Sequence, residues 1–524
     1  EPNVHVDHHV IWVDPDMPNH LINGNDGGLN MSYDAGKSWN KLNSIALGQF
    51  YAINVDYEKP YNVYGGLQDN GTWKGPHTYS YSKDYEAEGQ YPYKSIGGGD
   101  GMQVQIDRRN SNIVYAGSQF GYYNRMNLET GERKYIKPSH GLGEAPYRFN
   151  WETPILISPH NQDILYMGGN KLMRSMNQGD DWTPISPDLT AGGKKGNVPF
   201  GTLTNVTESP FQFGLLYTGS DDGVIQVTQD AGGSWAIISE ELPQDLWVSK
   251  VLASSHKKGR VYATLNGYRY DDFKPYVYVS DDFGASWKDI SSNLPLSPVN
   301  VIIEDPVKEN ILYLGTDDAS YISFDQGSSW ELLDGSMPNV AVHDMVVQTE
   351  ANDLVIGTHG RSIYITNLDE IQKFDAGKAS DLQLFELDAV DYSTNWGRSW
   401  SAWRAANAPE IKIAFYAPQS GKATLEILSA AEKTVKSWEV AVEKGFNYIP
   451  YDLTISEAGK KQLEKETKDL KIAKAQSDVY YIPPGSYQVQ VKVAGKTAST
   501  KLKVDEGSRR RDWAEAAANA PEED

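Results

Sequence analysis

Ser32-Tyr33-Asp34-Ala35-Gly36-Lys37-Ser38-Trp39 is an eight-residue phrase that the chain repeats four more times. The shared skeleton is Ser/Thr-x-Asp-x-Gly-x-x-Trp. The Asp side chain can accept backbone N–H bonds within its own turn, Gly supplies a left-handed position, and Trp buries a large apolar surface against a neighbouring unit. The later copies cover residues 175–182, 228–235, 280–287 and 323–330. Repeats of this period indicate a solenoid, a propeller or an array.

A second pattern precedes each copy and predicts two strands separated by a turn. Val10-Ile11-Trp12-Val13-Asp14-Pro15 followed by residues 20–24 is one example. Short β-rich runs with Asp, Pro or Asn between them are strand signals. The rhythm recurs about eight times, including near Trp73, Tyr123 and Tyr364, where the eight-residue phrase is absent. The sequence therefore predicts an all-β fold, a β-propeller of seven or eight four-stranded blades over residues 1–374.

The pattern changes after Phe374. Alternating segments over residues 375–505 predict a small antiparallel β-sandwich of immunoglobulin-like size. A Lys/Glu-rich stretch at about 456–476 has helical spacing and predicts an inserted helix. We expect residues 79–95 to form a surface loop and residues 506–524 to form a flexible tail.

Composition narrows the functional classes. The net charge of −22 argues against nucleic-acid binding, because no basic footprint is present to neutralise phosphates. The absence of Cys excludes disulfides and thiol catalysis. No apolar run has the length of a transmembrane segment, and no signal peptide is present in this chain. Since it begins at Glu1, we expect a processed or excised portion of something longer.

Several phrases resemble bacterial BNR/Asp-box propellers, a sortilin-type family often labelled as glycosyl hydrolases. The resemblance spans residues 4–504 and includes the small sandwich that follows such propellers. It implies the fold, a further propeller upstream or a partner chain, and functions ranging from sugar hydrolysis to peptide binding and assembly. It also implies a bacterial protein that is periplasmic, on the cell surface or secreted. A sialidase is disfavoured because Arg125, Arg148, Arg174 and Arg361 are scattered. The resembling phrases are His5-Val6-Asp7-His8-His9, Asn25-Asp26-Gly27-Gly28, Gly66-Leu67-Gln68-Asp69-Asn70-Gly71, residues 97–101 and Gly357-Thr358-His359-Gly360-Arg361.

Strand alternation assigns the motifs to two faces. If strands reverse direction outward from the axis, the turns between third and fourth strands lie on one face of the ring. The turns between second and third strands, and the links into each first strand, lie on the other, which we call the first-strand face. The Asp-box turns join third and fourth strands, so they lie on the face opposite the first-strand face. Their acidic or amide residues are expected to stabilise the turns rather than to bind a ligand: Asp34, Asn177, Asp230, Asp282 and Asp325.

The first-strand face collects the candidate ligand-binding and metal residues. His5, Asp7 and His9 lie on one side of an extended segment and could bind a divalent cation such as Zn²⁺ or Ca²⁺, or could hydrogen-bond neighbouring turns. Trp12, Trp73, Trp151 and Trp247 could stack on sugars or pack between blades. The residues predicted to bind a ligand are Gln68, Trp151, Glu152, His343, Asp344, His359 and Arg361.

Two functions remain open. The first is a binding module for a protein, a peptide or a glycan on the first-strand face. The second is a retaining or inverting glycoside hydrolase, which needs two carboxylates at a suitable separation and in different environments. Asp26, Asp69 and Asp100 come from successive units and are the candidates, although Asp-Gly and Asn-Gly are also ordinary turn sequences.

Overall fold

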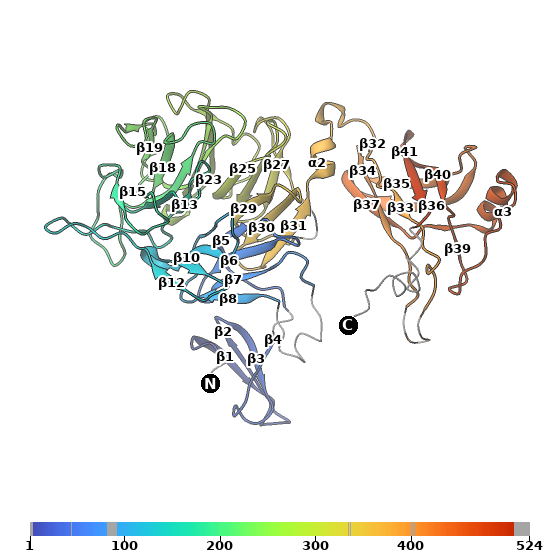
Figure 1. Cartoon of the computed structure of the whole chain (residues 1–524), viewed down its shortest axis with the longest axis horizontal. Coiled ribbons are helices and arrows are strands. Elements are labelled where there is room, and N and C mark those ends of the chain that lie inside the picture. The colour runs from blue at the N-terminus through green and yellow to red at the C-terminus, as the bar shows by residue number, and fades with distance from the viewer. Residues whose placement is uncertain are drawn as a thin grey trace, which may run out of the picture. The chain divides into compact units, whose positions relative to one another are not determined.

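The computed structural model describes residues 4–42, 45–80, 92–333, 335, 337–399, 401, 403 and 405–507. These residues form two compact units, Glu1–Leu368 and Asp369–Asp524 (Figure 1). Most of the predicted loop at 79–95 and of the predicted tail at 506–524 lies outside the described residues. Among the described residues, no helix is long and apolar enough to cross a membrane.

The first unit contains seven antiparallel sheets that follow one another along the chain, each with its strands paired in sequence order. The last sheet has three strands and the others have four. The seven are β5–β8 (Phe50–Val55, Asn62–Leu67, Gly71–Pro76, Lys94–Gly97), β9–β12 (Val104–Ile106, Ile113–Ser118, Tyr122–Asn127, Arg133–Tyr135), β13–β16 (Ile155–Ile157, Leu165–Gly168, Leu172–Ser175, Thr183–Pro184), β17–β20 (Leu203–Glu208, Leu216–Ser220, Ile225–Thr228, Ala236–Ile237), β21–β24 (Trp247–Ala253, Val261–Gly267, Asp272–Ser280, Lys288–Asp289), β25–β28 (Val299–Glu304, Leu312–Thr316, Ser320–Ser323, Glu331–Leu332) and β29–β31 (Val342–Gln348, Asp353–Thr358, Ile363–Asn367).

These sheets are the blades of a closed ring. The first strands of consecutive blades contact one another, and β29 of the last blade contacts β5 of the first. Polar bonds reinforce the closure: the Ile53 amide donates to Asp344 Oδ2 at 3.1 Å, and the Tyr61 hydroxyl donates to Asp353 Oδ2 at 3.0 Å. The molecule is therefore an all-β propeller whose ring has seven blades.

An eighth four-stranded sheet precedes the ring: β1 (His8–Val13), β2 (Leu21–Asn25), β3 (Gly28–Ser32) and β4 (Asn40–Leu42). We call it the edge blade. It has the strand order of a ring blade, but all six residues of β1 are exposed, whereas β5 is mostly buried. Val10, Ile11 and Trp12 are 62%, 60% and 45% exposed. The edge blade therefore has the pairing of a blade without the covering that a ring provides.

The repeated turns join the third and fourth strands, as their spacing predicts. In the first copy, Asp34 Oδ1 accepts the Ser38 amide at 2.8 Å, and Asp34 Oδ2 accepts the Ser38 hydroxyl at 2.7 Å. The structure adds a feature that the sequence does not reveal, because the residue before the glycine is also left-handed: φ is 60° at Ala35 and 83° at Gly36. The bond from the backbone amide recurs at Asn177, Asp230, Asp282 and Asp325. The bond from the serine hydroxyl recurs only at the three aspartates.

The tryptophan of the repeated turn connects adjacent blades. In the four copies within the ring, its indole N–H donates to a backbone carbonyl immediately after the fourth strand of the preceding blade. The pairs are Trp182 with Ile136, Trp235 with Ile185, Trp287 with Ile238 and Trp330 with Ile290, at 2.6–3.0 Å. Among the described residues, the Trp39 indole of the edge blade has no such acceptor.

A buried tyrosine recurs in the second strand of six ring blades. Four of the hydroxyls donate to a buried carboxylate: Tyr64 to Asp56, Tyr166 to Glu208, Tyr262 to Glu304 and Tyr313 to Asp305. The hydroxyls of Tyr115 and Tyr217 have no hydrogen-bond partner among the described residues. A buried carboxylate thus accepts the hydrogen bond of four of these six buried hydroxyls.

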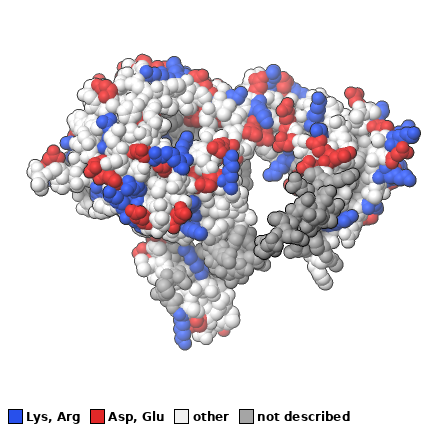
Figure 2. Space-filling view, in the orientation of Figure 1, with Lys and Arg blue, Asp and Glu red and all other residues white. Residues whose placement is uncertain are grey.

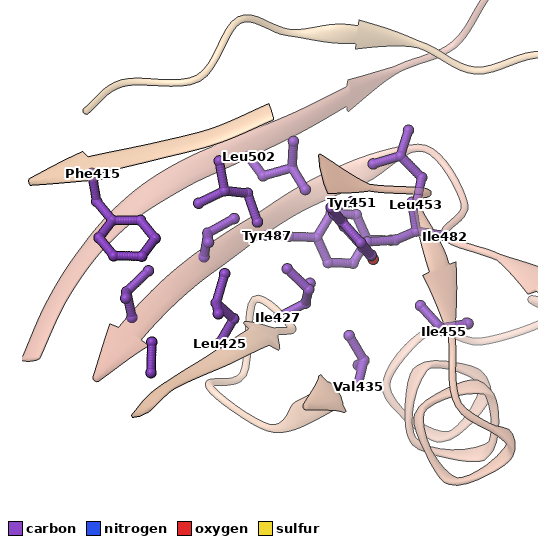
Figure 3. Packing of buried hydrophobic residues seen from close by; sticks show 14 of the residues in the cluster. Phe415, Leu425, Ile427, Val435, Tyr451, Leu453, Ile455, Ile482, Tyr487 and Leu502 are labelled. Atoms are coloured by element: carbon purple, nitrogen blue, oxygen red, sulfur yellow. The ribbon is translucent and has the colours of Figure 1, made fainter. Parts of the chain in front are cut away.

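The second unit is a β-sandwich around one apolar core, which includes Phe415, Leu425, Ile427, Tyr487 and Leu502 (Figure 3). Its sheets have the orders β32-β34-β37 and β33-β41-β40-β35-β36, with a small β38-β39 ribbon. The elements are α2 (Asp369–Lys373), β32 (Gln383–Leu384), β33 (Val390–Asp391), β34 (Ile411–Ala417), β35 (Gly421–Leu428), β36 (Thr434–Val442), β37 (Gly445–Tyr451), β38 (Thr454–Ile455), α3 (Glu457–Glu466), β39 (Tyr480–Tyr481), β40 (Gly485–Val493) and β41 (Lys496–Asp505).

Helix α3 is shorter than the predicted 456–476. Ser456 caps its N-terminus by accepting the Gly459 amide at 2.9 Å. Thr467 ends it in an extended conformation, and Asp469 is left-handed with φ of 66°. The apolar residues that follow, among them Leu470 and Ile472, pack on the sandwich core. The core contact therefore overrides the helical spacing of this stretch.

Candidate functional site

A cavity of about 800 Å³ lies at the axis of the ring and is lined by the first strands of the blades. We call it the axial cavity. A one-residue bulge in these strands explains why side chains point into it. The register shifts at Tyr51, Thr204, Ser249, Asn300 and His343. All five bulged residues line the cavity, as do the residues that follow four of them, including Lys250 and Asp344.

Many polar residues of the lining hold neighbouring blades together. First strands of adjacent blades splay apart, so side chains bridge them where backbone bonds do not. The side chains of Asn54, Ser249 and Asn300 donate to the carbonyls of Val104, Val299 and Val342. The side chains of Gln103, Gln105 and Asn205 accept the amides of Ile155, Ile157 and Val251. The residues left to interact with a ligand are therefore the charged and aromatic ones.

Glu152, Lys250 and Asp344 form the charged centre of the cavity. Lys250 Nζ lies 3.5 Å from Asp344 Oδ1, and Gln103 Nε2 donates to Glu152 Oε1 at 3.5 Å. Burial, reinforced by the charge of Asp344, raises the pKa of Glu152 to about 7. Asp344 forms an ion pair with Lys250, whose charge also acts on Glu152, and accepts a backbone N–H. Two carboxylates of one cavity thus have different environments, the condition for an acid and a base.

Two histidines form another part of the wall. The rings of His343 and His359 stack with centroids 4.2 Å apart and an interplanar angle of 9°. His359 Nδ1 lies 3.2 Å from the Phe50 carbonyl oxygen, which fixes this nitrogen as the donor. Burial, with the nearby His359 and Arg269, lowers the pKa of His343 to about 3. Burial also lowers the pKa of His359. Both imidazoles are therefore neutral near pH 7, and His359 also ties the last blade to the first.

Aromatic side chains surround the mouth of the cavity. Trp151, which is 38% exposed, meets Phe120 edge to face at 5.2 Å. In the β21–β24 blade, the Arg269 guanidinium lies over the rings of Trp247 and Tyr268, at 4.1 and 4.7 Å. Tyr268 and Arg269 belong to η2 (Tyr268–Tyr270), the turn between β22 and β23. The cavity therefore combines flat apolar surfaces with both signs of charge.

Six of the seven residues predicted to bind a ligand line the axial cavity. Arg361 does not line it. Its amide donates to Thr358 Oγ1 in the turn between β30 and β31. Trp151 and Trp247 line the cavity, whereas Trp12 lies on β1 and the Trp73 indole donates to the Asn70 carbonyl. Sequence reasoning missed Tyr268 and Arg269, although the stretch Gly267-Tyr268-Arg269-Tyr270 combines two aromatic residues with a cation.

The three aspartates proposed for catalysis lie elsewhere. Asp26, Asp69 and Asp100 are not part of the cavity lining. Asp100 Oδ1 accepts the Asp69 amide at 2.8 Å, and Asp69 is left-handed with φ of 60°. Burial, followed by the charges of Asp100 and Asp26, raises the pKa of Asp69. The three are thus electrostatic neighbours, and at least one carboxylate is engaged in turn structure.

The histidine segment at the start of the chain has separate partners. His9 Nε2 lies 2.5 Å from Asp26 Oδ1, and His5 Nε2 lies 3.1 Å from the Asp69 carbonyl oxygen. His5 Nδ1 lies 3.6 Å from Asp7 Oδ2. Within the described part of the chain, no three His, Asp or Glu side chains are grouped to hold a metal ion. The structure therefore does not gather His5, Asp7 and His9 into one site: His9 contacts Asp26 within the edge blade, and His5 links that blade to the first ring blade.

Charge is mixed over the surface rather than segregated. Figure 2 shows Lys and Arg interspersed with Asp and Glu across the displayed face of the molecule. The net charge of −22 is thus not concentrated in one acidic patch on that face.

Comparison with known proteins gives similarity to solved structures alone. No protein-family model matches the chain, and no curated protein matches it. Among solved structures, it is similar to a GH74 enzyme of Niastella koreensis (13% identity, 87% of this chain, 73% of that chain, TM-score 0.46). It is also similar to a GH74 xyloglucanase of Xanthomonas campestris (14% identity, 88% of this chain, 73% of that chain, TM-score 0.47). A further similar structure is YCF48 bound to D1 peptide (12% identity, 69% of this chain, 93% of that chain, TM-score 0.34). The propeller architecture follows from the strand pairing itself.

Proposed function

We propose that this protein is a glycan-binding propeller whose ligand occupies the mouth of the axial cavity. The observation that supports this most directly is the combination, at one concave site, of flat aromatic rings with charged groups that form hydrogen bonds. Sugar rings offer an apolar face to aromatic side chains and hydroxyls to polar ones. Trp151, Trp247 and Tyr268 supply the former, and Glu152 and Lys250 supply the latter.

The chemistry of the cavity favours a neutral glycan over a strongly charged ligand. Lys250 and Asp344 largely compensate each other, and the histidines are neutral near pH 7. Sugar hydroxyls can both donate to carboxylates and accept from ammonium or guanidinium groups, so one ligand class uses every group present. A peptide would need its own charges to match this balanced arrangement.

Isothermal titration with a panel of soluble β-glucan, xylan and galactomannan tests the proposal. We expect a Kd in the micromolar range or better for at least one polymer. Trp151→Ala should weaken this binding about tenfold or more, as is typical for a central aromatic residue. Trp12→Ala is the matched control, because Trp12 is similarly exposed but lies on the edge blade. Binding to a peptide ligand alone, or equal loss in both variants, would contradict the proposal.

A hydrolase remains the second candidate because Glu152 and Asp344 share the cavity but differ in environment. In that reaction, the Glu152 carboxyl would donate its proton to the glycosidic oxygen as the bond to the anomeric carbon breaks. Asp344 would take a proton from the water that attacks this carbon. Release of reducing ends from a bound polymer, lost in Glu152→Gln without loss of binding, would support it. A polymer that stays intact in the presence of bound wild-type protein would exclude it.

A further inference from the structure

A series of aromatic residues runs outward from the axial cavity over the β9–β12 blade. It begins at Trp151 and Phe120, which lies in the turn η1 (Gln119–Gly121) between β10 and β11. It continues to Tyr122 and Tyr135, whose ring centroids are 6.2 Å apart. These two tyrosines are 51% and 54% exposed, so their rings are accessible to solvent. We call Tyr122 and Tyr135 the outer platform.

Lys137 joins the outer platform to the residues near the cavity. Its ammonium lies 4.0 Å from the ring centre of Tyr122 and 4.8 Å from that of Phe149. Phe149 is buried two residues before Trp151. A cation over one face of a ring holds the ring in place and leaves its other face to a ligand. The outer platform is thus a positioned surface rather than a pair of isolated exposed side chains.

The opposite wall of the mouth carries a comparable surface. Tyr268 and Arg269 line the cavity; Tyr270 ends η2, and Phe273 is the second residue of β23. Tyr270 and Phe273 are 54% and 51% exposed. We call these two residues the facing platform. Both platforms lie on the first-strand face, because each is adjacent to a turn between the second and third strands of its blade.

We propose that the ligand is the interior of a long, neutral polysaccharide chain that crosses the mouth of the cavity and stacks on both platforms. This inference rests on the proposed glycan-binding function and adds the binding mode and the residues of the outer platform. A chain end or a short oligosaccharide would occupy only the cavity and would leave both platforms exposed. A series of flat surfaces on either side of one cavity fits a polymer of repeated rings, which presents an apolar face at each unit.

The experiment compares one polymer from the panel with its own oligosaccharides of two to ten units, using titration calorimetry. Wild-type affinity should rise with length until both platforms are covered. Tyr122→Ala/Tyr135→Ala should weaken polymer binding about tenfold and leave binding of the shortest bound oligosaccharide unchanged. Tyr448→Ala, at a 45% exposed tyrosine of the second unit, is the control and should change neither. Thermal melts confirm that each variant is folded.

The outcomes separate this inference from the proposed function. If short and long ligands bind wild-type protein equally, or if the double variant binds the polymer as tightly as wild type, the polymer-spanning mode is wrong while glycan binding stands. If no polymer or oligosaccharide binds at all, or only a peptide does, both the proposed function and this inference fail. Length-dependent affinity that the double variant removes supports both.

Discussion

Tyr313 and Tyr217 provide a direct test of how the blades are stabilised. They occupy the same position in the second strands β26 and β18, and both are fully buried. The Tyr313 hydroxyl donates to Asp305 Oδ2 at 2.8 Å, whereas the Tyr217 hydroxyl has no partner among the described residues. Replacing each by Phe removes one oxygen atom and leaves the ring, so the two substitutions differ only in what the hydroxyl contacts.

The expected effects are of different size. A hydrogen bond to a charged group contributes about 1.5–3 kcal/mol, so Tyr313→Phe should lower the free energy of unfolding by that amount. Asp305 keeps its bonds from the amides of Val307 and Lys308, which favours the lower end. Tyr217→Phe removes a buried unpaired hydroxyl, so it should leave stability unchanged or raise it by up to about 1 kcal/mol.

Urea unfolding followed by tryptophan fluorescence measures both values. Since the two units can unfold separately, the transition that shifts in these variants identifies the ring. The slope of free energy against urea should stay constant, because neither variant changes the surface exposed on unfolding. Equal destabilisation by the two substitutions, or a larger loss for Tyr217→Phe, would refute the view that the carboxylate pairing stabilises the blade.

Three further predictions concern pH and the edge blade. Burial and Asp344 raise the pKa of Glu152 to about 7 from 4.5, so the free energy of unfolding should fall as pH rises between these values. In urea titrations, Glu152→Gln should raise the free energy of unfolding by up to about 3 kcal/mol at pH 8 and leave it unchanged at pH 4. Burial lowers the pKa of His343 to about 3 from 6.5, so the free energy of unfolding should fall below pH 6.5 by up to about 1.4 kcal/mol per pH unit. His343→Asn should reduce this dependence on pH, and an unchanged dependence in the variant would contradict the prediction. The exposed apolar residues of β1 should promote self-association. The double variant Ile11→Asp/Trp12→Asp should lower the average mass measured by light scattering, and an unchanged mass would contradict a role of β1 in self-association.

The architecture was largely predictable because its signals are local and repeated. The turn phrase combines an Asp that bonds to its own turn, a left-handed Gly and a Trp, and each acts within about eight residues of sequence. The second left-handed residue, such as Ala35, was not predictable because alanine carries no preference for that conformation. The ring size also needed the structure: the edge blade has the same pattern as a ring blade, and only its exposure distinguishes it.

The candidate site was predictable in location but not in its chemistry. Strand alternation assigned Trp151, Glu152, His343 and Asp344 to one face, and all four line the axial cavity. The sequence could not show that Glu152 rather than Asp69 lines the axial cavity, because the cavity is formed by contacts between distant blades. A three-residue metal site was expected from the side on which His5, Asp7 and His9 project, but partners from other turns decide where those side chains bind.

Hydrogen exchange, measured with and without a saturating concentration of a polymer that binds, tests the proposed glycan site most directly. Binding at the mouth of the axial cavity should slow exchange in peptides that contain residues 150–153 and 247–251. The repeated turns at 228–235 and 280–287 lie on the opposite face and should exchange at the same rate in both samples. Protection of those turns, or protection confined to the second unit, would contradict a glycan site on the first-strand face.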